Sequence, residues 1–259
     1  MAIFKKDAFG NILLIKRFII FFFGAITYYR FNMANRTEVV GSENLKGLPD
    51  TKVLFVSNHQ TYFADVAAMI HVFGAAKWGV YNRMDFFWHL LNPRLNVYFI
   101  AAVETMKKGI LPRLFAYVGS VNIKRTWRAA GKDIDRSVDP RDVRKITKAI
   151  ESGWVITFPQ GTTKPFAPGR KGTAKIIKEY KPIVIPVVVN GFRRAFNKRG
   201  LLMKKRGQTL SITIKPPLNI DYSSTPDFIL NQIMDAIEQT DGFMKPKKLR
   251  SNHTSNPNG

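Results

Sequence analysis

The sequence predicts an α/β domain in which a layered, mixed sheet is flanked by helices. Short apolar runs alternate with helix-compatible segments between residues 37 and 242, which is the order typical of α/β layers. The run over residues 53–56 is continuously apolar, as in a strand buried on both faces. A Phe- and Ile-rich stretch, residues 11–31, comes before the first strand. We therefore expect an N-terminal helical segment (1–36), a main domain (37–242) and a basic, disordered tail (243–259).

The net charge and the lack of cysteine limit the kinds of partner and of chemistry that the protein can have. The chain has 259 residues, with 41 Lys and Arg against 18 Asp and Glu, a formal net charge of +23. Such a charge favours an anionic partner, either nucleic acid or an anionic membrane. The absence of cysteine excludes disulfides, thiolate chemistry and cysteine-ligated metals. Aromatic residues gather in apolar runs near the N-terminus, which favours the membrane.

The N-terminal stretch is too short to span a bilayer. The uncharged part runs from Phe18 to Tyr29, well below the roughly 20 residues that a spanning helix needs. No small-residue cleavage site follows, so we do not expect a signal peptide. We expect a membrane-associating helix lying in the interface, with flanking cations at the lipid headgroups. The cations expected at the headgroups are Lys5, Lys6, Lys16, Arg17 and Arg30. The alternative is that this helix packs on the protein's own core.

The remaining elements follow from apolar runs and from residues that start or stop helices. Pro140 after Asp139, and Thr225 before Pro226, mark helix starts. Pro186 interrupts an apolar strand and predicts a bulge or an edge position. The expected strands are residues 37–41, 51–57, 98–103, 119–125, 154–159, 182–190 and 210–214. The expected helices are residues 65–73, 105–117, 140–152 and 174–180, and a last helix that begins after Thr225.

The turn over residues 57–65 joins a buried strand to a helix and carries His59 and Asp65. Loops at the carboxyl ends of strands in α/β sheets present reactive side chains. Histidine titrates near neutrality, and a carboxylate one turn away fixes its tautomer. The alternative is a buried histidine beside an aspartate that caps the helix.

A second loop, residues 160–173, also joins an apolar strand to a helix. Backbone N–H groups at a helix start, together with cations, form a phosphate site. The Walker A spacing is absent. The alternative is a flexible basic loop. Its glycines and cations are Gly161, Gly169, Gly172, Lys164, Arg170 and Lys171.

Four blocks of the sequence, taken in order, resemble the glycerolipid (lysophosphatidic acid-type) acyltransferase family. The resemblance covers about residues 37–215, and four blocks at compatible spacing are fairly specific. The blocks are Asn58-His59 with Asp65, Gly119 with Ile123 and Arg125, Phe158-Pro159-Gln160-Gly161-Thr162, and Ile185-Pro186-Val187.

The resemblance implies a membrane-associated O-acyltransferase with its catalytic domain at residues 37–242. The donor would be acyl-CoA or acyl carrier protein, and the acceptor the hydroxyl of a lysophospholipid, most simply 1-acyl-glycerol-3-phosphate, which gives phosphatidic acid. His59 would act as general base and Asp65 would orient it. The implied location is the cytoplasmic face of the inner (plasma) membrane, with no metal, cofactor or nucleic acid. The implied substrate-binding residues are Arg125, Gln160, Gly161, Thr162, Thr163, Lys164, Arg170 and Lys171.

Two departures from the family pattern keep alternatives open. Five residues separate His59 from Asp65, where the family has four. The pair can meet if the extra residue lies in the turn, but a residue added within the helix rotates Asp65 by roughly 100°. Gln160 and Thr163 stand where the family has Glu and Arg. The alternatives are acylation of a lyso-aminolipid, or a non-catalytic protein that binds lipid or nucleic acid.

Overall fold

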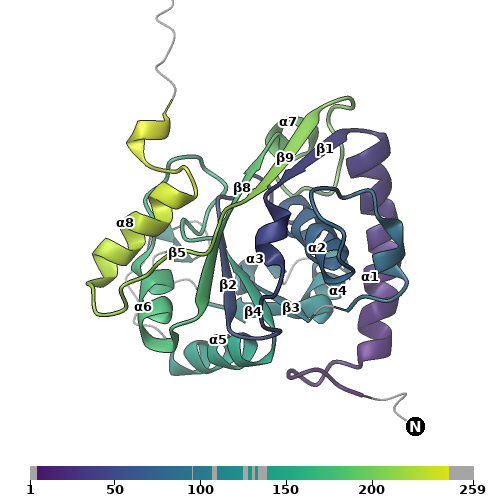
Figure 1. Cartoon of the computed structure of the whole chain (residues 1–259). Helices are drawn as coiled ribbons and strands as arrows, with labels where there is room; N and C mark the ends of the chain where they lie inside the picture. Colours follow the sequence, from purple (N-terminus) through teal and green to yellow (C-terminus); the bar gives the residue numbers. More distant parts are fainter. Residues whose placement is uncertain are drawn as a thin grey trace, which may run out of the picture.

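The computed structural model describes residues 5–94, 96–106, 110–124, 128–129, 132–133 and 139–244. Within these residues a seven-stranded sheet has the order β1-β9-β8-β2-β7-β3-β4 (Figure 1). β8 and β9 pair antiparallel and the other neighbours pair parallel. The predicted mixed sheet flanked by helices is therefore confirmed. The strands are β1 (Arg36–Val40), β2 (Val53–Ser57), β3 (Val97–Ala102), β4 (Ser120–Ile123), β7 (Trp154–Thr157), β8 (Ile183–Asn190) and β9 (Thr209–Ile214), and the short β5 (Arg128–Ala129) and β6 (Lys132–Asp133) pair separately.

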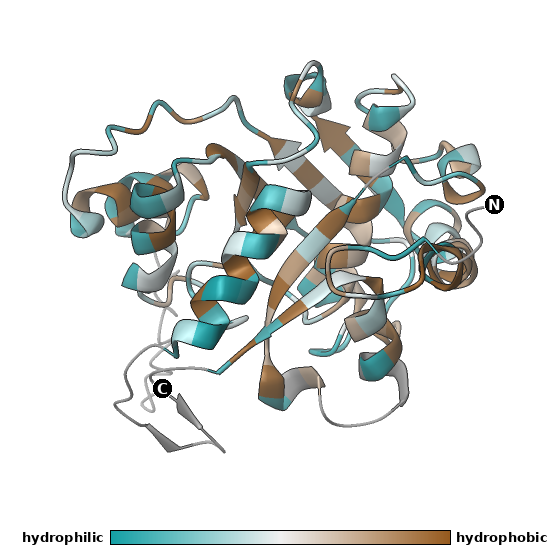
Figure 2. Cartoon of the chain, turned by 90° about the horizontal axis from the view of Figure 1, so that it is seen from below, coloured by the Kyte–Doolittle hydropathy of each residue, from teal (hydrophilic) through white to brown (hydrophobic). Residues whose placement is uncertain are grey.

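Helices cover both faces of the sheet. Consecutive residues of β2 enter opposite cores, with Phe55 in the core that contains α2 and Leu54 in the core that contains α5, α6 and α8. Figure 1 shows this division of the helices, and the view from below in Figure 2 also shows helices on both sides of the strands. One side carries α1 (Leu13–Tyr28), α2 (Ala64–Lys77), α3 (Val103–Met106) and α4 (Ile110–Gly119); the other carries α5 (Pro140–Ser152), α6 (Lys171–Tyr180) and α8 (Pro226–Ala236). Shorter elements are α7 (Phe192–Ala195), a π-helical turn η1 (Tyr29–Met33), and the 3-10 turns η2 (Ser42–Leu45), η3 (Phe87–Leu90) and η4 (Asp241–Phe243).

The predicted start signals operate as expected. The Asp139 side chain accepts a hydrogen bond from Arg141 N–H at the start of α5, and Thr225 Oγ1 accepts one from Phe228 N–H at the start of α8. Pro186 lies inside β8, which has neighbours on both sides and continuous register with β2, so the predicted bulge or edge position is wrong. Its carbonyl accepts a hydrogen bond from Lys215 N–H, just past the end of β9. Pro186 has no N–H to donate, and it lies just beyond Val187, where the hydrogen-bonded pairing of β8 with β9 ends.

The N-terminal helix α1 lies along the α2–α4 side of the domain. Ile19 and Gly24 are buried, while Leu14, Phe18 and Phe22 of the opposite face are more than half exposed. Among the helices of the described residues, none is long and apolar enough to span a bilayer.

Two of the cations expected at lipid headgroups are placed differently. Lys16 is buried, with its Nζ 3.4 Å from Asp7 Oδ2, so its predicted headgroup position is wrong. The side chain points into the domain because Asp7 offers a counter-charge there. Arg30 donates a hydrogen bond of 2.6 Å to the carbonyl of Leu201. The tail from residue 245 onward lies outside the described residues.

Candidate active site

The loop between β2 and α2 brings His59 and Asp65 together. α2 begins at Ala64, so the extra residue lies in the turn and Asp65 falls in the first turn of the helix. His59 Nδ1 lies 3.1 Å from Asp65 Oδ2. An ionised carboxylate only accepts hydrogen bonds, so Nδ1 carries the proton and Nε2 keeps its lone pair. Nε2 makes no hydrogen bond with any described residue, which leaves it available as a base.

Asp65 is completely buried and accepts hydrogen bonds from several donors. The backbone N–H groups of Gln60 and Thr61 donate to Oδ2 at 2.5 and 3.0 Å, and Thr61 Oγ1 donates to Oδ1 at 2.8 Å. This set suits an ionised carboxylate at a helix N-terminus. The carboxylate therefore fixes the whole turn as well as the imidazole.

Two further contacts fix the position and plane of the His59 ring. The buried Asn58 side chain donates to the Val189 carbonyl and accepts from the Val189 N–H, at 2.9 and 2.8 Å, which ties the turn to β8. The ring stacks on Phe158, with centroids 3.8 Å apart and planes 21° apart. Phe158 follows β7, the neighbour of β2.

His59 lines an amphipathic cavity of about 600 Å³. On one side the wall is apolar and includes Phe63, Val66 and Phe99. The start of α6 adds the cations Arg170, Lys171 and Lys175 to the wall, which also contains the carboxylates of Asp142 and Glu179. The first turn of α6 contains no acidic residue, so its N–H groups add positive potential beside these cations. A ligand with an apolar chain and an anionic group would match this division.

The predicted substrate-binding residues are placed in three different ways. Gly161, Thr162, Arg170 and Lys171 line the cavity. Gln160, Thr163 and Lys164 are absent from its wall. Arg125 lies outside the described residues.

Gln160 and Thr163 have other contacts that explain their positions. Gln160 is buried, and its Nε2 donates to the Ala167 carbonyl at 2.9 Å and to Gln239 Oε1 at 3.1 Å. The carbonyl of Thr163 accepts a hydrogen bond of 2.5 Å from Arg193 Nη2. Both residues thus hold the loop together.

The backbone N–H groups of Gly161 and Thr162 differ in their hydrogen-bond partners. Gly161 adopts φ +62°, and its N–H donates to the Phe158 carbonyl at 2.9 Å. The Gly161 N–H is therefore already used within the loop and is not free to hold an oxyanion. The N–H of Thr162 makes no hydrogen bond with a described residue, and Thr162 lines the cavity.

Arg193 makes two contacts that no pattern in the sequence indicates. Its Nη2 reaches the Thr163 carbonyl, and its N–H donates to Gln60 Oε1 at 3.2 Å. It thereby joins the His59 turn to the second loop. The sequence offered only a basic run from residue 193, with no sign of which cation makes the contact.

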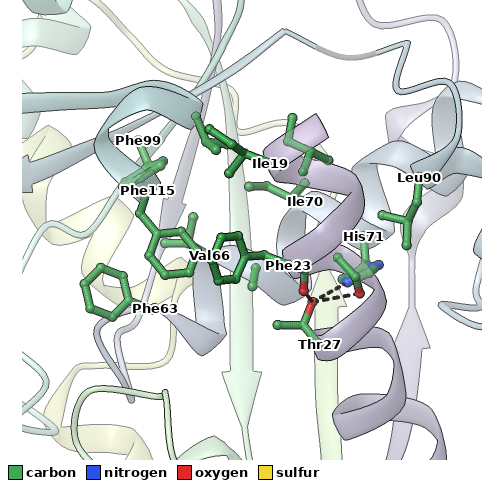
Figure 3. A pocket seen from close by; sticks show the side chains of 14 residues that line it. Ile19, Phe23, Thr27, Phe63, Val66, Ile70, His71, Leu90, Phe99 and Phe115 are labelled. Atoms are coloured by element: carbon green, nitrogen blue, oxygen red, sulfur yellow. Dashed lines mark hydrogen bonds between the residues drawn. The ribbon is translucent and has the colours of Figure 1, made fainter. Parts of the chain in front are cut away.

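A small apolar crevice of about 40 Å³ lies beside the cavity and shares Phe63, Val66 and Phe99 with it (Figure 3). Its far wall holds His71, whose Nε2 is 2.8 Å from Thr27 Oγ1 of α1. His71 Nδ1 is 3.1 Å from His89 Nε2. This second histidine site connects α1, α2 and η3.

The fold and the site define an α/β enzyme with a carboxylate-oriented histidine in an amphipathic cavity. A family model described as acyltransferase matches residues 36–190, more than half of the chain. The chain belongs to the acyltransferase family, as the sequence predicts.

Solved structures of similar fold include an acyltransferase. The crystal structure of the 1-acyl-sn-glycerophosphate (LPA) acyltransferase PlsC from Thermotoga maritima has a TM-score of 0.48 and 18% identity, covering 86% of this chain and 78% of that chain. No curated protein matches.

Proposed function

We propose that the protein transfers a fatty acyl group from a thioester, acyl-CoA or acyl carrier protein, to the hydroxyl of a lysophospholipid. The preferred acceptor is 1-acyl-glycerol-3-phosphate, which gives phosphatidic acid. The observation that carries the proposal is the 3.1 Å contact of His59 with Asp65 at the wall of an amphipathic cavity. Membership of the acyltransferase family supports it.

The proposed chemistry uses the acceptor hydroxyl as the nucleophile. His59 Nε2 takes the hydroxyl proton as the oxygen attacks the thioester carbonyl, and Asp65 stabilises the imidazolium. The Thr162 N–H is the candidate donor to the oxyanion that forms on the carbonyl oxygen. The C–S bond then breaks, and the leaving thiolate takes the proton back from His59. The products are an ester and a free thiol.

The anionic part of the substrate is proposed to lie at the start of α6. Arg170 and Lys171 line this end of the cavity, together with the N–H groups of the first helical turn. The apolar wall at Phe63 and Phe99 is proposed to accept an acyl chain. Thr163, where the family has Arg, keeps a lyso-aminolipid as the alternative acceptor.

Membrane contact is proposed to run along the exposed face of α1 and onto the loop beside it. Leu14, Phe18 and Met33 are 59%, 69% and 72% exposed, and Leu202 of the loop after α7 is 66% exposed. Contiguous exposed apolar residues indicate a lipid or protein contact. The loop is basic from residue 198 to residue 206, which suits an anionic surface. The proposed location is the cytoplasmic face of the inner (plasma) membrane.

An acyl-transfer assay tests the proposal. Purified protein would be given labelled acyl-CoA or acyl carrier protein with lysophosphatidic acid or a lyso-aminolipid. We expect a labelled diacyl product with lysophosphatidic acid and none from the His59→Ala variant. Product formation at the wild-type rate by that variant would contradict the mechanism, and product only from the lyso-aminolipid would change the acceptor.

A further inference from the structure

A second cavity, of about 590 Å³, lies at the other end of the sheet from His59. Asp50, Asn96 and Ser152 in its wall precede β2, β3 and β7. His59 and Phe158 follow β2 and β7. Because these strands are parallel, the second cavity, here called the basal cavity, is separate from the candidate active site.

The basal cavity concentrates positive charge. Two carboxylates in its wall are already paired, Asp7 with Lys16 at 3.4 Å and Asp50 with Lys77 at 2.6 Å. Four further cations of the wall form no ion pair with a described residue. These are Lys5, Lys6, Arg17 and Arg94. Like charges gathered in one cavity focus the potential and attract an anion.

An ordered N-terminal hairpin holds two of these cations in place. Asp7 Oδ1 accepts hydrogen bonds of 2.9 Å from the N–H groups of Phe9 and Asn11. The Lys5 carbonyl accepts a hydrogen bond of 2.9 Å from Leu13 N–H, at the start of α1. These hydrogen bonds hold the backbone of Lys5 and Lys6 in a defined position beside α1.

The arginines suit an oxygen-rich anion. The Arg94 guanidinium stacks over the Trp78 ring, 3.7 Å from its centroid, which leaves its edge N–H groups for a ligand. Arg17 is exposed on α1. Planar guanidinium groups bind phosphate oxygens with paired hydrogen bonds. The chemistry of the cavity thus points to a phosphate.

The surroundings favour a phosphate that carries acyl chains. Leu13 and Ile20 of α1 contribute apolar wall to the basal cavity. Arg17 lies three residues after Leu14, so the two side chains are neighbours on the helix surface. Leu14 begins the exposed apolar face of α1 that continues through Phe18. A headgroup in the cavity would therefore have an apolar surface next to it.

We propose that the basal cavity binds the phosphate of an anionic phospholipid whose chains lie along the exposed face of α1. This site is additional to the acceptor site at His59. It rests on the proposed membrane contact of α1 and is independent of the proposed chemistry.

Titration calorimetry of the full chain with short-chain lipids below their micelle concentration tests the site. The probes are dihexanoyl phosphatidylglycerol, dihexanoyl phosphatidylcholine and inorganic phosphate, with no acyl donor present. We expect phosphatidylglycerol to saturate one site that Arg17→Gln/Arg94→Gln weakens at least about tenfold, because charged hydrogen bonds are lost. The matched control Lys46→Gln/Arg144→Gln removes two exposed cations outside the cavity and should change affinity by no more than about twofold.

Two results would overturn the proposal. One is equal phosphatidylglycerol affinity in the wild type and in Arg17→Gln/Arg94→Gln. The other is inorganic phosphate or phosphatidylcholine binding as tightly as phosphatidylglycerol, since the site would then select neither chain nor charge. If the double variant unfolds, Arg17→Gln alone, on the exposed side of α1, replaces it. Turnover of His59→Ala tests the proposed function separately, so the two failures are distinguishable.

Discussion

His59, just before α2, and the pair formed by His71 of α2 and His89 of η3 are hydrogen-bonded histidines whose electrostatic surroundings differ. His59 contacts the buried Asp65 carboxylate and lines a cavity. His71 contacts His89 and Thr27, and His89 Nδ1 contacts the Phe86 carbonyl. Among the described residues, no carboxylate forms a hydrogen bond with His71 or His89. Of these three histidines, His59 alone can therefore become positively charged with a counter-charge already in place.

The buried pair is suited to stay neutral. Burial, reinforced by His89, lowers the pKa of His71 to about 3, and burial lowers the pKa of His89. In a neutral pair, Nδ1–H of His89 donates to the Phe86 carbonyl and Nδ1–H of His71 donates to His89 Nε2. The Thr27 hydroxyl, which contacts His71 Nε2, also donates to carbonyls of its own helix. The comparison shows that a hydrogen-bonded histidine is a candidate base only where a carboxylate accompanies it. Without a carboxylate, as in His71–His89, the histidines serve to hold helices together.

The largest expected effect is loss of turnover in His59→Ala. General-base catalysis contributes about 10²–10⁴-fold, so acyl transfer should fall by that factor. The free energy of unfolding should change by about 1 kcal/mol or less, because the imidazole is partly exposed and Asp65 keeps its other donors. Labelled-acyl transfer and urea denaturation measure the two quantities. Wild-type turnover would remove the distinction between the two histidine sites.

Asp65→Asn should reduce turnover by roughly 10²-fold while leaving the His59 ring in the cavity. The new amide cannot accept all the hydrogen bonds that Asp65 accepts, so stability should fall by about 1–3 kcal/mol. Steady-state kinetics and thermal melting check both. A variant that loses stability but keeps its turnover would show that Asp65 only shapes the loop.

His71→Ala should give the opposite pattern. It removes the link between Thr27 and His89 and leaves a void beneath α1, so the free energy of unfolding should fall by about 2–4 kcal/mol. Turnover per folded molecule should stay within a few-fold of wild type. Denaturation with activity measured below the transition checks this. A loss of turnover as large as in His59→Ala, without loss of stability, would contradict the structural role.

The same pair predicts a pH dependence of stability. The folded pKa of His71, about 3, lies below the unfolded value of 6.5, so between these values the unfolded chain binds more protons. Stability should therefore fall as the pH drops below 6.5, by up to about 1.4 kcal/mol per pH unit for His71 alone. His89 acts in the same direction. Unfolding at pH 7.5, 6 and 5 measures the slope, which His71→Gln should flatten; an unchanged slope would mean that other groups cause it.

The smallest expected effect belongs to Arg193, which joins the two loops of the site. Arg193→Ala removes its hydrogen bond to Thr163 while keeping the backbone contact to Gln60. We expect a KM increase of a few-fold with kcat nearly unchanged, because positioning rather than chemistry is affected. The adjacent Arg194→Ala, also exposed, is the matched control. Equal KM values in both variants would mean that the contact of Arg193 with Thr163 does not affect substrate binding.

Much of the fold follows from local signals that the sequence displays. Continuous apolar runs located β2 and β8, and Asp139 and Thr225 marked helix starts through hydrogen bonds between neighbouring residues. The His59 turn was found because it follows such a strand. These features depend on residues close together in the chain.

The features that escaped prediction depend on distant partners. Lys16 is buried because Asp7 folds back in a hairpin, and Gln160 turns inward because Gln239 meets it. His71 and His89 are 18 residues apart, with no common motif. Because of the extra residue before Asp65, the sequence did not decide whether Asp65 contacts His59. The direction of the Asp65 side chain depends on where α2 begins, and the structure places that start at Ala64.

The central claim is that His59 presents an unprotonated Nε2 while Asp65 holds the proton on Nδ1. Two-dimensional ¹⁵N NMR of histidine-labelled protein at pH 8, with His59→Ala for assignment, measures this directly. We predict a His59 signal pair with the proton on Nδ1 and an acceptor-type Nε2. A His59 ring with the proton on Nε2 would contradict the account, because that nitrogen could not act as the base.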